Sequence, residues 1–166
     1  MTEKIALIFV SVLFSISAFA LSTDREQPIL IEADKATIDN IKRVAIYEGD
    51  VIITQGTIRI NANTVTLNYN QKQDIDKVTA VGKQARFKQR LDCGDEIRAN
   101  AKQMEYNALK NTLYLHEEAE LRKVKGNKDI YTSNAPRIIY DTQNGIIKAD
   151  RGRVFVKIQP QHTPKK

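Results

Sequence analysis

Apolar and polar residues alternate with a period of two along most of the chain, and this pattern predicts β-strands. The alternation is clearest in Ile29-x-Ile31-x-Ala33, Ile58-x-Ile60-x-Ala62 and Val65-x-Leu67-x-Tyr69. Further segments with the same pattern lie at 44–46, 51–53, 104–106, 113–115, 138–140 and 154–158. Only residues 35–43 and 109–111 are compatible with a helix, and both segments are short. The sequence therefore predicts an all-β fold.

The predicted strands share an internal repeat, in which an apolar residue is followed by any residue, a small residue, and Asp or Asn. The four copies are Ile31–Asp34, Ile60–Asn63, Ile97–Asn100 and Tyr131–Asn134, and from Ala33 the small residues recur at intervals of 29, 37 and 34. A repeat of roughly 34 residues that contains only strands predicts stacked β-layers, in which each layer covers the open edge of its neighbour.

The second half of each repeat predicts a tight turn followed by another strand. Gly49, Gly82 and Gly152 occupy these positions, and Glu117 replaces the glycine in the third copy. Glycine suits such turns because it adopts positive φ without steric cost. The recurring Asp and Asn side chains are expected to bond turn backbones rather than to form one catalytic cluster.

The apolar side chains of the strands predict an interior along the whole length of the fold. If this interior is fully packed, the protein is a structural β-solenoid. If it is open along one side, it is a groove suited to lipid.

The first twenty residues differ from the rest and predict a signal peptide. Lys4 gives a positive start, residues 5–16 form an apolar run, and Ala18-Phe19-Ala20 matches the small-x-small site of signal peptidase, with cleavage expected after Ala20. An uncleaved membrane anchor is the alternative, but the run is shorter than the roughly 20 residues that cross a bilayer. The predicted organisation is a signal peptide at 1–20, one β-domain at 21–158 and a polar basic tail at 159–166.

The formal net charge is +6, and removal of residues 1–20 leaves it unchanged because that segment contains one Lys and one Glu. An anionic lipid, glycan or membrane surface is the expected partner. Nucleic acid is disfavoured by the export signal and by the lack of aromatic residues interleaved with the cations. The single cysteine, Cys93, permits no intramolecular disulfide, so burial must stabilise the fold.

The sequence offers no catalytic residues, metal ligands or cofactor motif. His116 and His162 are too far apart in sequence to suggest a metal-ligand pair, and no Gly-rich phosphate loop is present. The alternative function is a secreted β-solenoid that binds glycans or processes polysaccharides, since such solenoids also place Asp and Asn at turns.

Three stretches carry a resemblance to a known family. They are Gln27-Pro28-Ile29-Leu30-Ile31-Glu32-Ala33-Asp34, then Tyr47-Glu48-Gly49-Asp50-Val51-x-x-Thr54-Gln55-Gly56, and Gly82-Lys83-Gln84-Ala85-Arg86-Phe87. Through them the chain resembles the OstA-like family of periplasmic lipopolysaccharide transport proteins, over nearly all of the sequence after the signal peptide.

The resemblance implies a half-open, twisted antiparallel β-jellyroll that encloses the acyl chains of lipid A in the periplasm and has no enzyme activity. It also implies lipid-lining roles for Ile29, Ile31, Phe87 and Tyr106. Ile53 and Ile58 join this predicted set, although each of the six could equally be an ordinary core residue. A membrane-tethered component with the same fold is a further alternative, opposed by the cleavable signal.

Two other groups of residues follow from this interpretation. Arg59, Lys83, Arg86 and Lys88 are candidates to meet lipid A phosphates at the rim of the groove, although scattered cations are commonly only solubilising. Ile29 and Ile31 in the first strand, with Val154 and Val156 in the last, are expected to form pairable edges. Such edges would join molecules head to tail, and would join the chain to inner-membrane and outer-membrane transport components.

Overall fold

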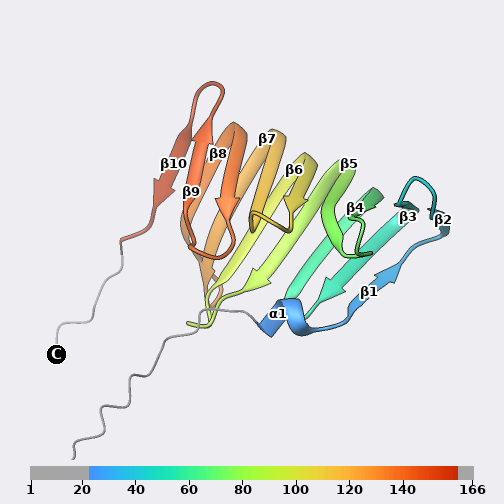
Figure 1. Cartoon of the computed structure of the whole chain (residues 1–166). Helices are drawn as coiled ribbons and strands as arrows, with labels where there is room; N and C mark the ends of the chain where they lie inside the picture. Colours follow the sequence, from blue (N-terminus) through green and yellow to red (C-terminus); the bar gives the residue numbers. More distant parts are fainter. Residues whose placement is uncertain (1–22, 161–166) are drawn as a thin grey trace, which may run out of the picture.

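The computed structural model describes residues 23–160, which form one antiparallel sheet of ten strands and a four-residue helix (Figure 1). The helix α1 spans Thr23–Glu26. The strands are β1 (Ile29–Glu32), β2 (Lys35–Asp39), β3 (Val44–Gln55), β4 (Ile58–Tyr69), β5 (Ile75–Arg90), β6 (Glu96–Asn107), β7 (Thr112–Lys125), β8 (Lys128–Asp141), β9 (Ile147–Asp150) and β10 (Phe155–Ile158). The predicted all-β class is confirmed, and the helix-compatible residues 35–39 form β2 instead.

Each edge of the sheet is a single strand interrupted once. The strand order is β1-β3-β4-β5-β6-β7-β8-β10, with β2 also pairing with β3 and β9 also pairing with β8. Strands β1 and β2 are therefore the two halves of one edge, and β9 and β10 are the two halves of the other. Figure 1 shows these edges at opposite ends of the molecule.

The long central strands bend, so that their two halves face each other. Ile58 and Leu67 lie near opposite ends of β4 yet line the same cavity, which has a volume of about 220 Å³. Nine residues of straight strand would separate them by about 30 Å, far more than a cavity of that size spans. The bend coincides with register shifts in the ladders between neighbouring strands.

These register shifts correct the turn prediction. Gly49, Gly82 and Glu117 lie inside the continuous strands β3, β5 and β7, at or beside breaks in register, and not in turns between strands. Positive φ serves a β-bulge as well as a turn, and a bulge bends its strand and increases its twist. Gly152 lies between β9 and β10, where the edge strand is interrupted.

The recurring Asp and Asn residues lie beside these bulges. Gly49 has a φ of +79°, and a Cβ atom there would overlap the Asp34 side chain. A Cβ atom on Gly82 would overlap the Asn63 side chain, whose Oδ1 accepts a hydrogen bond of 3.1 Å from the backbone N–H of Lys83. Asn63 thus bonds the bent backbone, as the recurrence predicted, at a bulge instead of a turn. The Asn100 side chain instead donates to the Glu120 carboxylate, at 3.1 Å.

Alternation places one side of every bent strand in a shared interior. Among the most deeply buried side chains are those of Leu67, Met104, Leu113, Leu115, Leu121, Ile138 and Tyr140. Most of these belong to β6–β8, so the C-terminal half of the interior is a packed hydrophobic core.

Several features of the chain lie outside the described residues. These are the predicted signal peptide at 1–20, its cleavage site after Ala20, and residues 161–166 of the tail with His162. Within residues 23–160, no helix is long and apolar enough to cross a membrane.

The bulge at Gly49 is open to a direct test. Gly49→Ala and Gly94→Ala both place a Cβ at positive φ, at +79° and +82°, but only the first meets another side chain. The strain of this conformation alone costs about 1–2 kcal/mol. We expect Gly49→Ala to lower the free energy of unfolding in urea by at least about 1 kcal/mol more than Gly94→Ala. Equal losses would show that the contact with Asp34 is not structurally important.

Candidate lipid-binding site

An apolar cavity lies between the two halves of the bent strands, in the N-terminal part of the sheet. Its volume is about 220 Å³, and it is open on one side. The lining comes from β1, β3, β4, β5 and β6 and from the two loops that precede β7 and β9. The lining residues are Ile29, Ile53, Gln55, Ile58, Ile60, Leu67, Ile75, Val78, Phe87, Tyr106, Ala108 and Thr142.

Five of the six residues predicted to contact lipid lie in this lining. They are Ile29, Ile53, Ile58, Phe87 and Tyr106. The sixth, Ile31, pairs with Ile53 across the β1–β3 ladder and packs against the core outside the cavity. The structure therefore brings together most of the predicted set, while its role in binding stays a prediction.

Sequence reasoning missed much of the lining. The alternation places Ile60 on the same face as Ile58, and Leu67 on the same face as Val65, but neither was in the predicted lining. Ile75 and Val78, at the start of β5, face Phe87 only because that strand bends. Thr142 comes from a loop, and no local pattern indicates its position.

The interior is thus neither fully packed nor hollow throughout. The side chains of Leu115, Leu121 and Ile138 are almost completely buried and fill the C-terminal half. The open cavity in the N-terminal half is smaller than the roughly 300–1,000 Å³ of typical ligand pockets. Binding of several acyl chains would therefore require the open side to widen.

Helix α1 lies against the open side and is fastened there by a buried carboxylate. Asp24 is only 3% exposed. Its Oδ1 accepts a hydrogen bond of 2.7 Å from the Thr57 backbone N–H, and its Oδ2 accepts bonds of 2.8 Å from the Thr57 hydroxyl and 3.5 Å from the Gln89 amide. A Cβ atom on Gly56 would overlap the Asp24 carboxylate, so the approach requires glycine there. Thr57 lies directly before the cavity-lining Ile58, and Gln89 lies two residues after Phe87.

A second contact continues this attachment. The side-chain amide of Gln55, itself part of the lining, donates a hydrogen bond of 3.2 Å to the Gln27 carbonyl. Residues 24–27 are therefore fixed to the end of β3, to the β3–β4 turn and to β5. We call this segment, with the Asp24 and Gln27 contacts, the latch.

The cavity lining in the described residues contains no acidic or basic side chain. Burial raises the pKa of Tyr140 to about 12, with a smaller contribution from the nearby Asp141. Its phenol is thus neutral in the whole physiological range of pH. The Tyr140 and Ser133 hydroxyls have no hydrogen-bond partner among the residues that the structure describes.

The predicted phosphate-binding cations do not line this cavity. Arg59, Arg86 and Lys88 alternate with inward-facing residues such as Ile60 and Phe87, so strand geometry turns them to the outer face of the sheet. Lys83 is exposed beside the bulge at Gly82. The outward orientation of Arg59 could have been predicted from the alternation, because Arg59 stands between two residues that face inward.

Both predicted edge strands lie at the ends of the sheet. β1 pairs only with β3, and β10 pairs only with β8. Ile29 is 39% exposed, Val156 is 45% exposed, and Val154 lies just before β10. Each strand leaves one side of its backbone unpaired within the described chain.

No group of three or more His, Cys, Asp or Glu side chains in residues 23–160 is arranged to hold a metal ion. Cys93 is exposed in the turn between β5 and β6.

Comparison with known proteins agrees with this architecture. A family model described as LptA/(LptD N-terminal domain) LPS transport protein matches residues 30–146. The lipopolysaccharide export system protein LptH of Pseudomonas aeruginosa is 39% identical over 155 residues, covering 87% of this chain and 86% of that protein. The lipopolysaccharide export system protein LptA of Escherichia coli K12 is 39% identical over 114 residues, covering 68% of this chain and 62% of that protein.

A solved structure has the same fold. The crystal structure of LptH, titled the LptA homologous periplasmic component of the conserved lipopolysaccharide transport device from Pseudomonas aeruginosa, superimposes with a TM-score of 0.75. The sequences are 34% identical, and the match covers 83% of this chain and 99% of that chain. The predicted half-open antiparallel β-jellyroll is therefore confirmed.

The latch can be opened by one substitution. Asp24→Ala leaves the Thr57 N–H without its acceptor, and such a loss costs about 1–3 kcal/mol. We expect faster hydrogen exchange in residues 55–58 and stronger fluorescence from an apolar dye that enters the cavity. Glu26→Ala, on an exposed residue of the same helix, should change neither signal. If both variants behave like the wild type, α1 does not restrict access.

Proposed function

The chain belongs to the family described as LptA/LptD N-terminal domain lipopolysaccharide transport proteins, and from this we propose that it carries lipopolysaccharide across the periplasm. In this proposal the acyl chains of lipid A lie in the cavity lined by Ile58, Val78 and Phe87. The saccharide headgroup remains outside, because burying its polar groups without partners is costly.

The observation that carries the proposal is the apolar, open-sided cavity inside an otherwise packed fold. Each acyl methylene removed from water contributes about 0.8 kcal/mol, or about 10 kcal/mol for a chain of twelve carbons. A cavity of this kind can hold chains that would otherwise remain in a membrane. Transfer in one direction then depends on a free-energy source elsewhere, since the sequence has no phosphate-binding loop for ATP.

We infer a carrier that acts by binding, without catalysis. The relatives are named as export system proteins, and the cavity lining in the described residues contains no acidic or basic side chain. Export to the periplasm, with the signal peptide removed after Ala20, belongs to the same proposal, as does the absence of a resident cofactor.

The free edges support a bridge made of several molecules. The exposed β1, with Ile29 and Ile31, would pair with the exposed end of another molecule formed by Val154, Val156 and the rest of β10. Such a contact joins two different surfaces and therefore continues as a filament. The same edges would accept the inner-membrane and outer-membrane components of the transport system.

Neighbouring residues in β5 offer a matched test of lipid binding. Val78 lines the cavity, whereas Thr79 points to the outer face. Val78→Glu places a carboxylate among the acyl chains, and we expect it to weaken binding of purified lipopolysaccharide at least tenfold. Thr79→Glu adds the same charge and should bind within about twofold of the wild type, with circular dichroism confirming that both variants fold. Equal binding by the two variants would place the acyl chains elsewhere.

The edge contact is tested at Val156. The Gln159 N–H donates to the Ile130 carbonyl, so by the alternation of antiparallel strands the Val156 N–H points away from β8. Val156→Pro removes one outward donor without breaking the ladder within the molecule. We expect the concentration-dependent rise in mass measured by light scattering to disappear, while thermal unfolding stays close to that of the wild type.

Lys157→Pro is the control for this experiment, because it removes a donor that faces β8. It should lower the unfolding temperature. Oligomers that persist in Val156→Pro would exclude β10 as the interface.

A further inference from the structure

A row of cations crosses the outer face of the half-sheet that carries the cavity-lining Phe87. Arg59, Lys88, Arg98 and Arg122 belong to β4, β5, β6 and β7, and each stands directly opposite the next in the strand register. Thr132 of β8 follows Arg122, and Lys157 of β10 follows Thr132. We call these five cations, together with Arg86 beside them, the cation row.

Such a row of like charges is expected to destabilise the folded sheet. Like charges at directly opposite positions of an antiparallel pair destabilise the pair. Here three successive ladders place one cation against another. The arrangement therefore calls for an explanation other than sheet stability.

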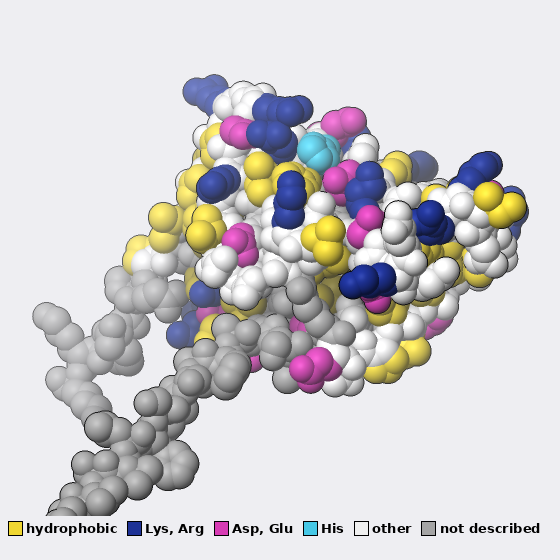
Figure 2. Space-filling view, viewed as in Figure 1, with side chains coloured by type: hydrophobic (Ala, Val, Ile, Leu, Met, Phe, Trp, Pro, Cys, Tyr) yellow, Lys and Arg dark blue, Asp and Glu magenta, His cyan; other side chains and the backbone are white. Residues whose placement is uncertain are grey.

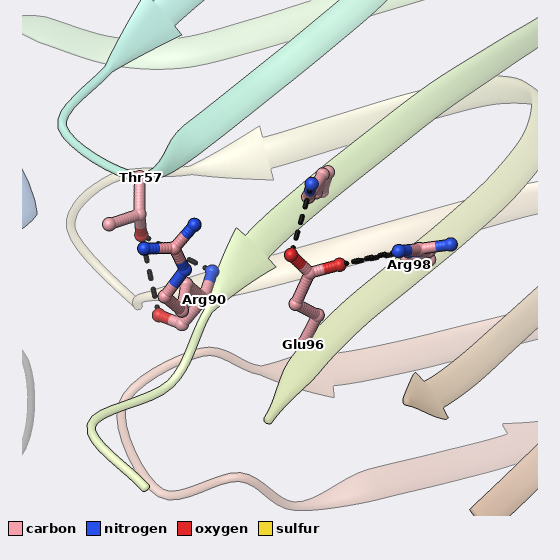
Figure 3. Close-up of polar contacts among 5 residues, drawn as sticks. Thr57, Arg90, Glu96 and Arg98 are labelled. Carbon is pink, nitrogen blue, oxygen red and sulfur yellow. Dashed lines mark hydrogen bonds and ion pairs between the residues drawn. The ribbon is translucent and has the colours of Figure 1, made fainter. Parts of the chain in front are cut away.

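Acidic residues balance the row only in part. Glu96 binds both Arg98, at 2.7 Å, and Lys88, at 3.0 Å (Figure 3). The hydrogen bonds from Arg98 and then Lys88 lower the pKa of Glu96, so it remains ionised. Glu120 and Asp129 form ion pairs with Arg122, at 3.2 and 3.5 Å. Within the described residues, no ion pair involves Arg59, Arg86 or Lys157.

On the outer face of the other half-sheet, two pairs of directly opposing residues carry opposite charges. There Lys35 stands opposite Glu48 and pairs with it at 3.0 Å, and Arg137 stands opposite Asp150 and pairs with it. Figure 2 shows the face that carries His116, where basic and acidic side chains are mixed. A general excess of positive charge would affect both faces alike, so the row is a specific feature of one face.

The row runs parallel to the open side of the groove. Arg59 is the second residue after Thr57 of the β3–β4 turn, which places it about 7 Å from the rim along the strand. Figure 3 shows Thr57 bonded to the backbone of Arg90, the last residue of β5, with Glu96 and Arg98 at the start of β6. Strands are about 4.8 Å apart, so the four adjacent cations of β4–β7 extend over about 14 Å.

We propose that the cation row binds the phosphate groups of the cargo's saccharide headgroup, which emerges at the rim while the acyl chains remain inside. This inference rests on the proposed function. Arg and Lys form charge-assisted hydrogen bonds with phosphate oxygens. The row also continues to β10, beyond the cavity, so a headgroup can pass from one cation to the next toward the C-terminal edge.

The proposal is tested with the phosphorylated saccharide of lipopolysaccharide from which all acyl chains have been removed. The double variant Arg59→Gln/Arg86→Gln removes two cations and breaks no ion pair among the described residues. We expect it to weaken binding at least fivefold and to reduce the dependence of binding on NaCl concentration. Lys77→Gln/Lys148→Gln removes the same charge from the other outer face and should bind within about twofold of the wild type.

Two further measurements show whether the saccharide binds through its phosphate groups and outside the acyl-chain cavity. Dephosphorylated saccharide should lose most of its affinity, and Val78→Glu should bind the phosphorylated saccharide like the wild type. The proposal is overturned if the wild type does not bind the phosphorylated saccharide, if dephosphorylation has no effect, or if the Arg59/Arg86 variant binds normally. It is also overturned if inorganic polyphosphate binds the row and the saccharide does not.

These results can be separated from a failure of the carrier proposal. If intact lipopolysaccharide binds and Val78→Glu abolishes that binding, the acyl-chain site stands whatever the cation row does. If intact lipopolysaccharide does not bind at all, the carrier proposal itself fails.

Discussion

The structure depends on alternation of side chains along strands that bend at bulges, where the register between neighbouring strands shifts. Because each long strand from β3 to β8 contributes to both halves, one inward face per strand encloses the interior that the structure describes. The bend is made by bulges, which require residues such as Gly49 at positive φ and a short polar side chain such as Asp34 beside them. Two copies of the repeated Asp or Asn, Asp34 and Asn63, thus lie against the bulges that bend the strands.

One side of this bent sheet remains open, and the functional features are gathered there. The Asp24 carboxylate fastens α1 to the turn at Thr57, directly beside cavity-lining residues. Cations stand outside the same rim, while apolar residues stand inside it. The rim therefore separates two environments, as expected for a site that holds an amphipathic molecule by its apolar part.

The strands and much of the cavity lining could be predicted because alternation is a local property. The turns were misplaced because residues that suit a turn also suit a bulge, as Gly49 does at a φ of +79°, and only strand pairing distinguishes the two. Ile31 and Ile53 have the same pattern and stand opposite each other, yet only Ile53 lines the cavity, which the local pattern does not indicate. Asp24 could not be found, since its partners Thr57 and Gln89 are 33 and 65 residues away.

The central claim is that acyl chains occupy the cavity between the two halves of the bent strands. Nuclear Overhauser effects between acyl protons of bound lipopolysaccharide and the isoleucine methyl groups of the protein test it most directly. The account predicts contacts with Ile58, Ile60 and Ile75, which line the cavity, and none with Ile52 or Ile139, which face outward. Contacts with Ile52 and Ile139 but not with the cavity residues would contradict it.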